Sequence, residues 1–209
     1  MSSAGDAGPA NCTGWFSEPL STDAPGANFP SSIPEITGVG GSEFNENNGS
    51  YWTIQNTANG ASALSYIPEM AWNDSVAAGT IQAGGGGPSL LYPKPSWQTG
   101  IGVPSDGVRD TPDVAMTASA FHDPPLFCTL GTCGGTGGTS FAAPVFAGIV
   151  VLVNQSLIAR GVQTQPGLGN INPTLYRLAS SLTAGAFSRY YGWQQRYTMW
   201  LRHAGLRNG

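Results

Sequence analysis

Charged side chains are scarce in this sequence, and lysine is almost absent. Its 209 residues hold 8 Lys and Arg against 12 Asp and Glu, which gives a formal net charge of -4. Lys94 is the single lysine. So few cations cannot form a basic patch for the phosphates of nucleic acid or of an anionic membrane. The composition therefore argues against both partners.

Long apolar runs and a leader-like start are also missing. No run of about 18 apolar residues is present, and the chain does not open with a positive charge followed by an apolar stretch. We therefore expect neither a membrane span nor a signal peptide in it. With 40% apolar residues but 30 Gly and 16 Pro, the chain is predicted to form one loop-rich folded domain rather than a disordered one.

Only three cysteines occur. Cys128 and Cys133 bracket a turn-like Thr-Leu-Gly-Thr segment and have the spacing to close a small loop, whereas Cys12 stands alone. Such a loop fits an exported protein better than a cytosolic one. Three unpaired thiols are the alternative, because no metal-ligand pattern accompanies this weak spacing.

Short strands and one long helix are expected. Residues 35–41 and 112–120 have the apolar and small-residue patterns of short buried strands in a parallel sheet. From Ser140 to about Ala159, apolar residues leave almost no polar face, which predicts a buried helix. Pro144 is compatible with it, since the first turn does not need its N–H group.

The connecting segments should be irregular. Residues 10–33 and 84–112 are rich in Gly, Pro, Ser and Asn. We expect them to be surface loops around a rigid α/β centre.

A glycine-rich segment, Gly134-Gly-Thr-Gly-Gly-Thr-Ser140-Phe-Ala-Ala-Pro144, precedes the expected helix. It puts the Ser140 hydroxyl where substrate can approach closely and where the helix N-terminus stabilises developing negative charge. These are the requirements of a nucleophilic serine. The simpler reading is that Ser140 merely caps its helix.

These residues resemble the nucleophile motif Gly-Gly-Thr-Ser-x-x-x-Pro of the sedolisins, or serine-carboxyl peptidases, and a related motif occurs in subtilisins. Further stretches resemble sedolisins specifically and follow in the same order over about residues 1–187. They are Ser2-Ser-Ala-Gly-Asp6-Ala-Gly, Ile36-Thr-Gly-Val-Gly-Gly41, Tyr66-Ile-Pro-Glu-Met-Ala-Trp-Asn73 with Gly84-Gly-Gly-Gly-Pro-Ser and Lys94-Pro-Ser-Trp-Gln98, Arg109-Asp-Thr-Pro-Asp-Val-Ala, and Gly167-Leu-Gly-Asn-Ile-Asn-Pro-Thr-Leu-Tyr176.

The resemblance implies an α/β fold, a subtilisin-like parallel sheet flanked by helices, with its N-terminal part missing. It also implies a serine-type endopeptidase with Ser140 as nucleophile and Asp6 as the oxyanion-hole acid. A partly protonated carboxyl group can donate a hydrogen bond to an oxyanion at acid pH. Gly84, Gly85 and Gly86 resemble the strand that pairs with the substrate backbone, where glycine avoids collision; a flexible loop is the alternative.

The base of the resembled family is a glutamate oriented by an aspartate four residues further along a helix, in a segment that precedes the Asp6 motif. No Glu-x-x-x-Asp pair occurs anywhere in this chain: Glu18, Glu43 and Glu69 are followed four residues later by Thr, Asn and Asn. We therefore expect an incomplete catalytic set, and a chain that is inactive alone.

Residues 188–209 differ from the rest. All twelve acidic residues precede this tail, which holds four arginines and five Tyr or Trp residues. The resembled family carries a calcium site here, in a Phe-His-Asp-Ile-Thr-like stretch. Permissible codons for residues 188–195, read one nucleotide later, spell His-Asp-Ile-Thr-Gly-Gly-Asn. We therefore expect a partial peptidase domain at 1–187, an atypical and possibly frameshifted tail, and no metal or other cofactor bound by this chain.

Two rival readings stay open. A subtilisin-type Asp-His-Ser peptidase needs a histidine upstream of the serine, and only His122 is available, in a Phe-His-Asp-Pro-Pro loop. A non-catalytic fragment or pseudoenzyme is the other. Under the peptidase reading, we expect peptide or protein substrates, an extracellular location, and a monomer without nucleic-acid or membrane partners.

Overall fold

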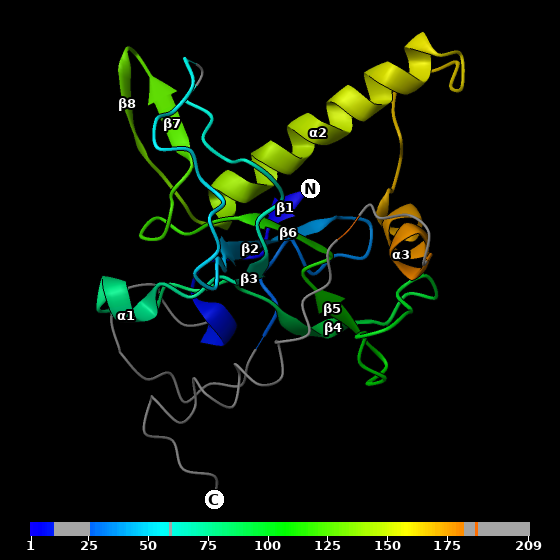
Figure 1. Ribbon diagram of the computed structural model, residues 1–209. Coiled ribbons are helices and arrows are strands. Elements are labelled where there is room, and N and C mark those ends of the chain that lie inside the picture. Colours follow the sequence, from blue (N-terminus) through cyan, green and yellow to red (C-terminus); the bar gives the residue numbers. More distant parts are fainter. Residues whose placement is uncertain (11–25, 59, 182–186, 188–209) are drawn as a thin grey trace, which may run out of the picture.

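The computed structural model describes residues 1–10, 26–58, 60–181 and 187 (Figure 1). Its strands are β1 (Ser2–Ser3), β2 (Gly38–Phe44), β3 (Glu69–Ala71), β4 (Gly87–Pro93), β5 (Val108–Thr111), β6 (Val114–Thr117), β7 (Leu126–Thr129) and β8 (Thr132–Gly135). Its α-helices are α1 (Ser75–Ala78), α2 (Thr139–Ala159) and α3 (Asn172–Ser180), and a short 3-10 turn covers Gly8–Ala10.

Strand β2 is the centre of the main sheet. It pairs in parallel with β1 and with β6, and antiparallel with β3. Both predicted strands are thus confirmed, and they are neighbours. Two glycines in β2 allow other side chains to pack directly against the strand backbone. A Cβ added at Gly40 would lie 2.5 Å from Pro112 Cγ, and one at Gly41 would lie 2.7 Å from Trp72 Cε3.

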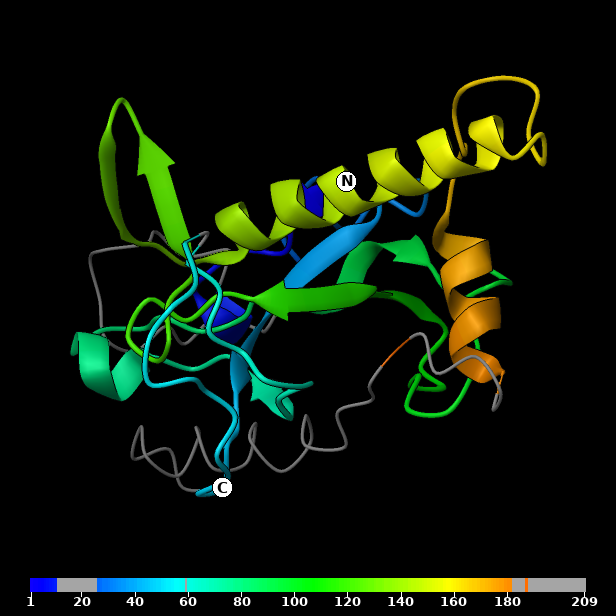
Figure 2. The ribbon, with the colours of Figure 1, turned by 45° about the horizontal axis from the view of Figure 1, so that its top comes forward.

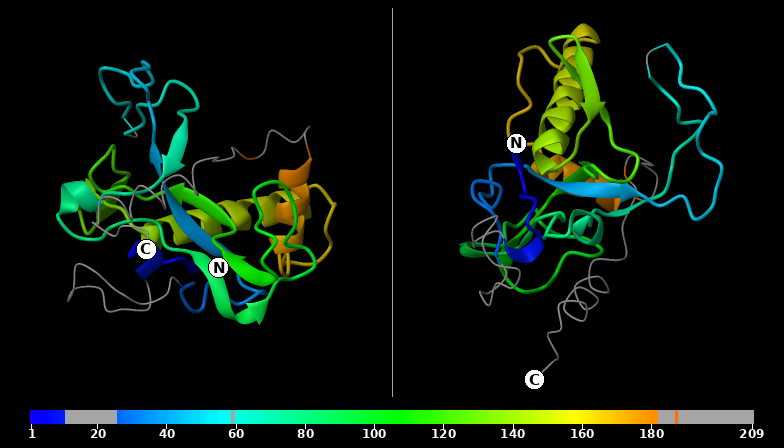
Figure 3. Two further views of the ribbon diagram at one scale, coloured as in Figure 1. Left: turned by 90° about the horizontal axis from the view of Figure 1, so that it is seen from below. Right: turned by 90° about the vertical axis from the view of Figure 1, so that its left-hand side faces the viewer.

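Helix α2 lies across this sheet (Figure 2). Its first turns pack Ala142, Ala143 and Phe146 against Val39 of β2, and these four residues form the buried apolar core. Side chains from β6, from later in α2 and from α3 surround that core. The sheet seen from its other side, with α2 behind it, is shown in Figure 3.

The helix begins where the sequence predicts, but the prediction that it is buried is wrong for the described part of the chain. Beyond Phe146 most of its large apolar side chains are exposed: Ile149, Val151, Leu152, Val153 and Ile158. The reason is geometric, because α2 is apolar on all sides while the sheet contacts only one. Its length of 21 residues and mean hydropathy of 1.9 would suffice, by length and composition only, to cross a membrane, which is weak evidence for a span. The expected absence of a membrane span stays a prediction.

Residues 84–112 are also more ordered than predicted. They contain β4 and β5, an antiparallel pair with a register shift. At one end of this pair, Arg109 and Asp113 form a fully buried ion pair, with Arg109 Nη2 2.6 Å from Asp113 Oδ2. The same carboxylate accepts hydrogen bonds from the Gly38 N–H and the Tyr176 hydroxyl. Burial raises the pKa of the Asp113 carboxyl above its usual value, and the Arg109 guanidinium opposes only part of this rise.

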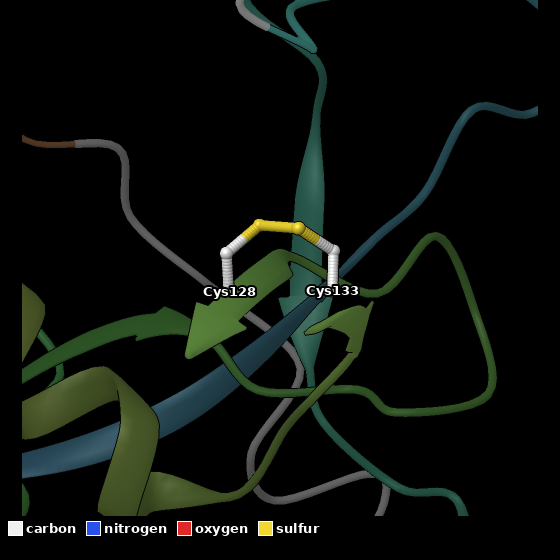
Figure 4. The surroundings of a disulfide bond; sticks show 2 residues. All are labelled: Cys128 and Cys133. Carbon is white, nitrogen blue, oxygen red and sulfur yellow. A yellow bond between two sulfur atoms is a disulfide. The ribbon is translucent and has the colours of Figure 1, made fainter. Parts of the chain in front are cut away.

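Strands β7 and β8 form an exposed hairpin that projects beside α2 (Figure 1). Cys128 and Cys133 face each other across it and are joined by a disulfide bond (Figure 4). The expected small loop is thus closed. Cys12 and the atypical tail, residues 188–209, lie outside the described residues.

Candidate active site

The predicted catalytic residues lie at the carboxyl ends of parallel strands. Asp6 follows β1, and the segment that leads into α2 begins after β6. The Gly138 N–H donates to the carbonyl of Ala118 at 2.7 Å, which ties the start of α2 to the end of β6. In α/β sheets this edge is where ligands bind and where chemistry is placed.

Asp6 is joined directly to the first turn of α2. Its Oδ1 accepts hydrogen bonds from the Thr139 N–H at 2.7 Å and from the Thr139 hydroxyl at 2.6 Å. The Thr139 hydroxyl oxygen also accepts from the Gly5 N–H at 3.1 Å. Thr139 therefore fixes the Asp6 carboxylate next to Ser140, across a sequence separation of 133 residues.

Two glycines before Ser140 make this contact possible. Gly138 has φ +84°, and a Cβ there would lie 2.6 Å from Asp6 Oδ2. A Cβ at Gly137 would lie 2.4 Å from the Ala118 carbonyl oxygen. Any larger residue at either position would force the carboxylate or the loop away. A Cβ at Gly135 would lie 2.8 Å from Pro124 Cγ, whereas Gly134 has open space around it. Of the four glycines in this segment, Gly134 alone is therefore not sterically required.

Ser140 is the second residue of α2 and is exposed. The N-cap residue is Gly138, which has no side chain that could cap the helix. The reading of Ser140 as a mere helix cap is therefore wrong, since the serine lies inside the first turn. There it is exposed, next to the Thr139 N–H group that donates to Asp6. The structure brings Ser140 and Asp6 together, and their catalytic roles stay a prediction.

Gly84, Gly85 and Gly86 lie just before β4, and the N–H groups of the first two are used inside the chain. Gly84 donates to the Trp72 carbonyl at 3.0 Å, and Gly85 donates to the Gly5 carbonyl at 2.7 Å. A Cβ at Gly86 would lie 2.4 Å from the Thr111 carbonyl oxygen. Close backbone packing explains Gly84 and Gly86, and the substrate-binding role of Gly84, Gly85 and Gly86 stays a prediction.

One supporting residue was missed by the sequence analysis. Asp74 is buried, and its carboxylate accepts hydrogen bonds from the Ser119 hydroxyl at 2.7 Å and the Ala120 N–H at 3.0 Å. It thereby holds the loop after β6, against which Gly137 packs. The residues around it, Met-Ala-Trp-Asn before and Ser-Val-Ala-Ala after, form no sequence pattern that indicates this role.

His122, the candidate base of the rival reading, binds carboxylates rather than Ser140. Its Nε2 lies 3.0 Å from Glu46 Oε2 and 3.1 Å from Asp123 Oδ2. Ligand atoms of these three residues lie within 4.8 Å of one another, close enough to hold a metal ion. This contact explains His122 as part of an ion-pair cluster and gives no support to an Asp-His-Ser triad.

An exposed serine at the start of a helix, at the carboxyl edge of a sheet and beside a fixed carboxylate, is the arrangement that the resemblance to sedolisins predicts for an α/β, subtilisin-like fold. Comparison with solved structures agrees: the chain matches the Pseudomonas sedolisin, a serine-carboxyl proteinase complexed with two molecules of pseudo-iodotyrostatin. The TM-score is 0.61 with 26% identity, over 97% of this chain and 55% of that one.

The chain belongs to the sedolisin family. It is 34% identical over 159 residues to kumamolisin from Bacillus sp. (strain MN-32), covering 72% of this chain and 24% of that protein. It is 35% identical over 123 residues to sedolisin from Pseudomonas sp. (strain 101), covering 58% and 18%. No family model matches. The chain spans about a quarter or less of the length of these curated relatives.

Proposed function

We propose that this chain carries the nucleophile half of a serine-type endopeptidase site, in which Ser140 attacks the substrate carbonyl and Asp6 stabilises the oxyanion. The observation that carries the proposal is the double hydrogen bond between Asp6 Oδ1 and Thr139, the residue before Ser140. It fixes a carboxyl group at the start of the helix that presents the serine.

The two oxygens of Asp6 have different environments, and this suits an oxyanion hole. Oδ1 is held by Thr139, whereas Oδ2 has no hydrogen-bond partner among the described residues. When Oδ2 carries a proton, it can donate a hydrogen bond to the oxygen that becomes negative as Ser140 Oγ adds to the carbonyl carbon. Donors placed in advance at such an oxygen typically contribute about 10²- to 10³-fold in kcat.

The addition step also needs a base for the Ser140 proton, which is later given to the leaving amine. Family resemblance assigns this to a glutamate oriented by an aspartate, and no such Glu-x-x-x-Asp pair occurs in the sequence. We propose that the chain alone is inactive. Without a base to activate the serine, most of the rate enhancement that the catalytic residues provide together is lost.

Further proposals rest on the same family membership. Peptidase relatives support peptide or protein substrates, and they fit an extracellular location. We also propose a monomer without nucleic-acid partner. For calcium, we propose that this chain does not bind the ion at the site of the resembled family, because residues 188–209 contain no Asp or Glu, and calcium prefers oxygen ligands that usually include carboxylates. A calcium-dependent rise in thermal stability, beyond that with magnesium, would contradict this.

The experiment is peptide hydrolysis at acid pH by purified protein. The chain alone should be silent. The same chain joined to a sedolisin segment that supplies the Glu and Asp should cleave, and Ser140→Ala should abolish that cleavage, whereas Asp6→Asn should lower kcat by about 10²-fold with little change in KM. Cleavage by the joined protein that survives Ser140→Ala would contradict the proposal.

A further inference from the structure

Three side chains that can each offer one atom to a metal ion meet in the loops above the main sheet. We define the His122 cluster as Glu46, His122 and Asp123, whose ligand atoms all lie within 4.8 Å of one another. His122 Nε2 is 3.0 Å from Glu46 Oε2 and 3.1 Å from Asp123 Oδ2. None of the three has a part in the proposed peptidase chemistry, so the cluster needs an explanation of its own.

The topology of the sheet brings the cluster together. Glu46 comes shortly after β2, which ends at Phe44, and His122 and Asp123 come shortly after β6, which ends at Thr117. Strands β2 and β6 are parallel neighbours, so the loops that leave their carboxyl ends lie at the same edge. In α/β proteins this edge is where ligands bind.

The backbone of both loops is held in place by hydrogen bonds. The His122 N–H donates to the Ser119 hydroxyl oxygen at 2.8 Å, and that hydroxyl donates to the buried Asp74 carboxylate at 2.7 Å. After Glu46 the chain turns sharply, with the Gly49 N–H donating to the Glu46 carbonyl at 2.7 Å. The imidazole and the Glu46 carboxylate are therefore anchored in position by contacts other than their own.

An ion pair alone leaves this cluster electrically unbalanced. Two carboxylates share one imidazole, which carries at most one positive charge, and no Lys or Arg pairs with either carboxylate among the described residues. In addition, Glu46 Oε1 is buried and has no hydrogen-bond partner in that part of the chain. A buried acceptor without a partner calls for an unmodelled water or ion. A divalent cation at the centre of the cluster would balance both carboxylates.

The donor atoms select the kind of ion. Calcium and magnesium prefer oxygen ligands, whereas one imidazole nitrogen with carboxylate oxygens suits zinc. With zinc–ligand bonds of about 2.0–2.2 Å, donor atoms around a tetrahedral ion lie about 3.3–3.6 Å apart. The separations of 3.0 and 3.1 Å therefore need to widen by only a few tenths of an ångström, about as much as a rotation of exposed side chains allows.

We propose that the His122 cluster is a zinc site, formed by Nε2 of His122 and one carboxylate oxygen each from Glu46 and Asp123, with the fourth position taken by water. The ion ties the loop after β2 to the loop after β6. The second loop also packs against the glycine-rich segment before Ser140, since a Cβ at Gly137 would lie 2.8 Å from the Ala120 nitrogen.

This proposal replaces the sequence-based expectation that the chain binds no metal, but only for zinc and only at this place. That expectation came from residues 188–209, which are not part of the cluster. The proposed absence of calcium binding at the site of the resembled family is unaffected. The zinc site also does not depend on the proposed peptidase function, because no step of that function uses Glu46, His122 or Asp123.

The test is calorimetric titration of the untagged full chain with zinc chloride at pH 7.5, in a Cys12→Ser background because a thiol also binds zinc. One ion should bind per chain, and equal concentrations of calcium or magnesium should not compete. Replacing a residue that merely orients a ligand costs about 10–100-fold in metal affinity, so His122→Gln or Glu46→Gln, each of which removes a ligand, should weaken binding by about 100-fold or more.

Two matched controls separate the cluster from the rest of the chain. His203→Gln removes the other histidine, and Asp106→Asn removes a carboxylate that pairs with Lys94 instead; both should leave zinc affinity unchanged. The proposal is overturned if the parent chain binds no zinc, if His203→Gln abolishes binding while His122→Gln retains it, or if Asp106→Asn weakens binding as much as Glu46→Gln does. Displacement of zinc by an equal concentration of calcium would contradict the choice of ion.

A second measurement uses unaltered ligands and so does not depend on whether the variants fold. In long-range ¹H–¹⁵N spectra of the histidine rings, saturation with zinc should shift the Nε2 resonance of His122 and leave the proton on Nδ1. Coordination through Nδ1, or a His122 ring that does not change while zinc is bound, would contradict the proposed geometry. The Ser140→Ala chain should give the same spectra, whatever the outcome for the peptidase function.

Discussion

Two regions of this molecule reverse the usual distribution of side chains, in which charged groups lie at the surface and aliphatic groups lie in the interior. Around Arg109 and Asp113, a full ion pair is buried, because the chain itself supplies the hydrogen-bond partners Gly38 and Tyr176. In the later turns of α2, aliphatic side chains are exposed, because no described part of the chain lies beside them. Residue type alone therefore does not decide burial here; the presence of a partner does.

The largest expected effect concerns the buried ion pair. Asp113→Ala should lower the free energy of unfolding by about 3–5 kcal/mol, because it leaves the Arg109 charge buried without its counterion. Urea unfolding measures this. Asp106→Ala is the control: it removes a partly exposed partner of Lys94, and the expected cost is at most about 1 kcal/mol. Equal costs for the two substitutions would contradict the account of the ion pair.

Helix α2 allows the comparison to be made within one element. Phe146→Ala removes a buried ring from the core and should cost about 3 kcal/mol or more. Leu152→Ala in the free chain should change stability by less than about 0.5 kcal/mol, as is usual for surface positions. Thermal or urea unfolding of the two variants decides the matter. A large cost for Leu152→Ala would show that the later turns of α2 are covered within the free chain.

A smaller effect is expected at the contact that joins Asp6 to the helix. Thr139→Val keeps the shape of the side chain but removes the hydroxyl that binds Asp6 Oδ1 and the Gly5 N–H. The expected loss of stability is about 1–3 kcal/mol, the cost of leaving buried polar groups unsatisfied. Thr139→Ser, which retains the hydroxyl, should recover most of it; failure of that rescue would assign the loss to packing instead.

The smallest effect is the pH dependence of the His122 cluster. Burial alone lowers the pKa of His122, but its hydrogen bond to Glu46 and the charges of Glu46, Asp123 and Glu43 raise it overall. A raised folded-state pKa means that the cluster stabilises the fold below about pH 6.5, the unfolded value, and that this contribution is lost as pH rises through the folded-state pKa. The His122 side chain is 46% exposed, so less than about 1 kcal/mol is expected. An NMR titration in which Glu46→Gln leaves the pKa of His122 unchanged would contradict this cause.

Much of the framework was predictable from the sequence, because it depends on local pattern. The strands near residues 35–41 and 112–120 and the start of α2 follow from runs of apolar and small residues. The β4 and β5 pair was missed because its prolines and glycines are typical of loops. The exposure of α2 was missed for another reason: apolarity shows that a surface favours burial, but it does not show whether a partner is present.

The candidate site was predictable only in part. The Gly-Thr-Ser sequence points to Ser140 by itself, whereas Asp6 is an ordinary loop aspartate until family resemblance joins it to a serine more than a hundred residues away. The role of Thr139 as the link and of Asp74 as the support of the neighbouring loop depends on tertiary contacts. The same holds for the buried Arg109 and Asp113, since charged residues are almost never fully buried unless paired.

The most direct test of the central claim is covalent labelling of Ser140 with a fluorophosphonate, read by peptide mass spectrometry. In the chain assembled with the remaining part of the sedolisin fold, the account predicts one adduct, on Ser140, formed more slowly in the Asp6→Asn variant and not formed by the chain alone. An adduct on a different residue, or an assembled protein in which Ser140 does not react, would contradict it.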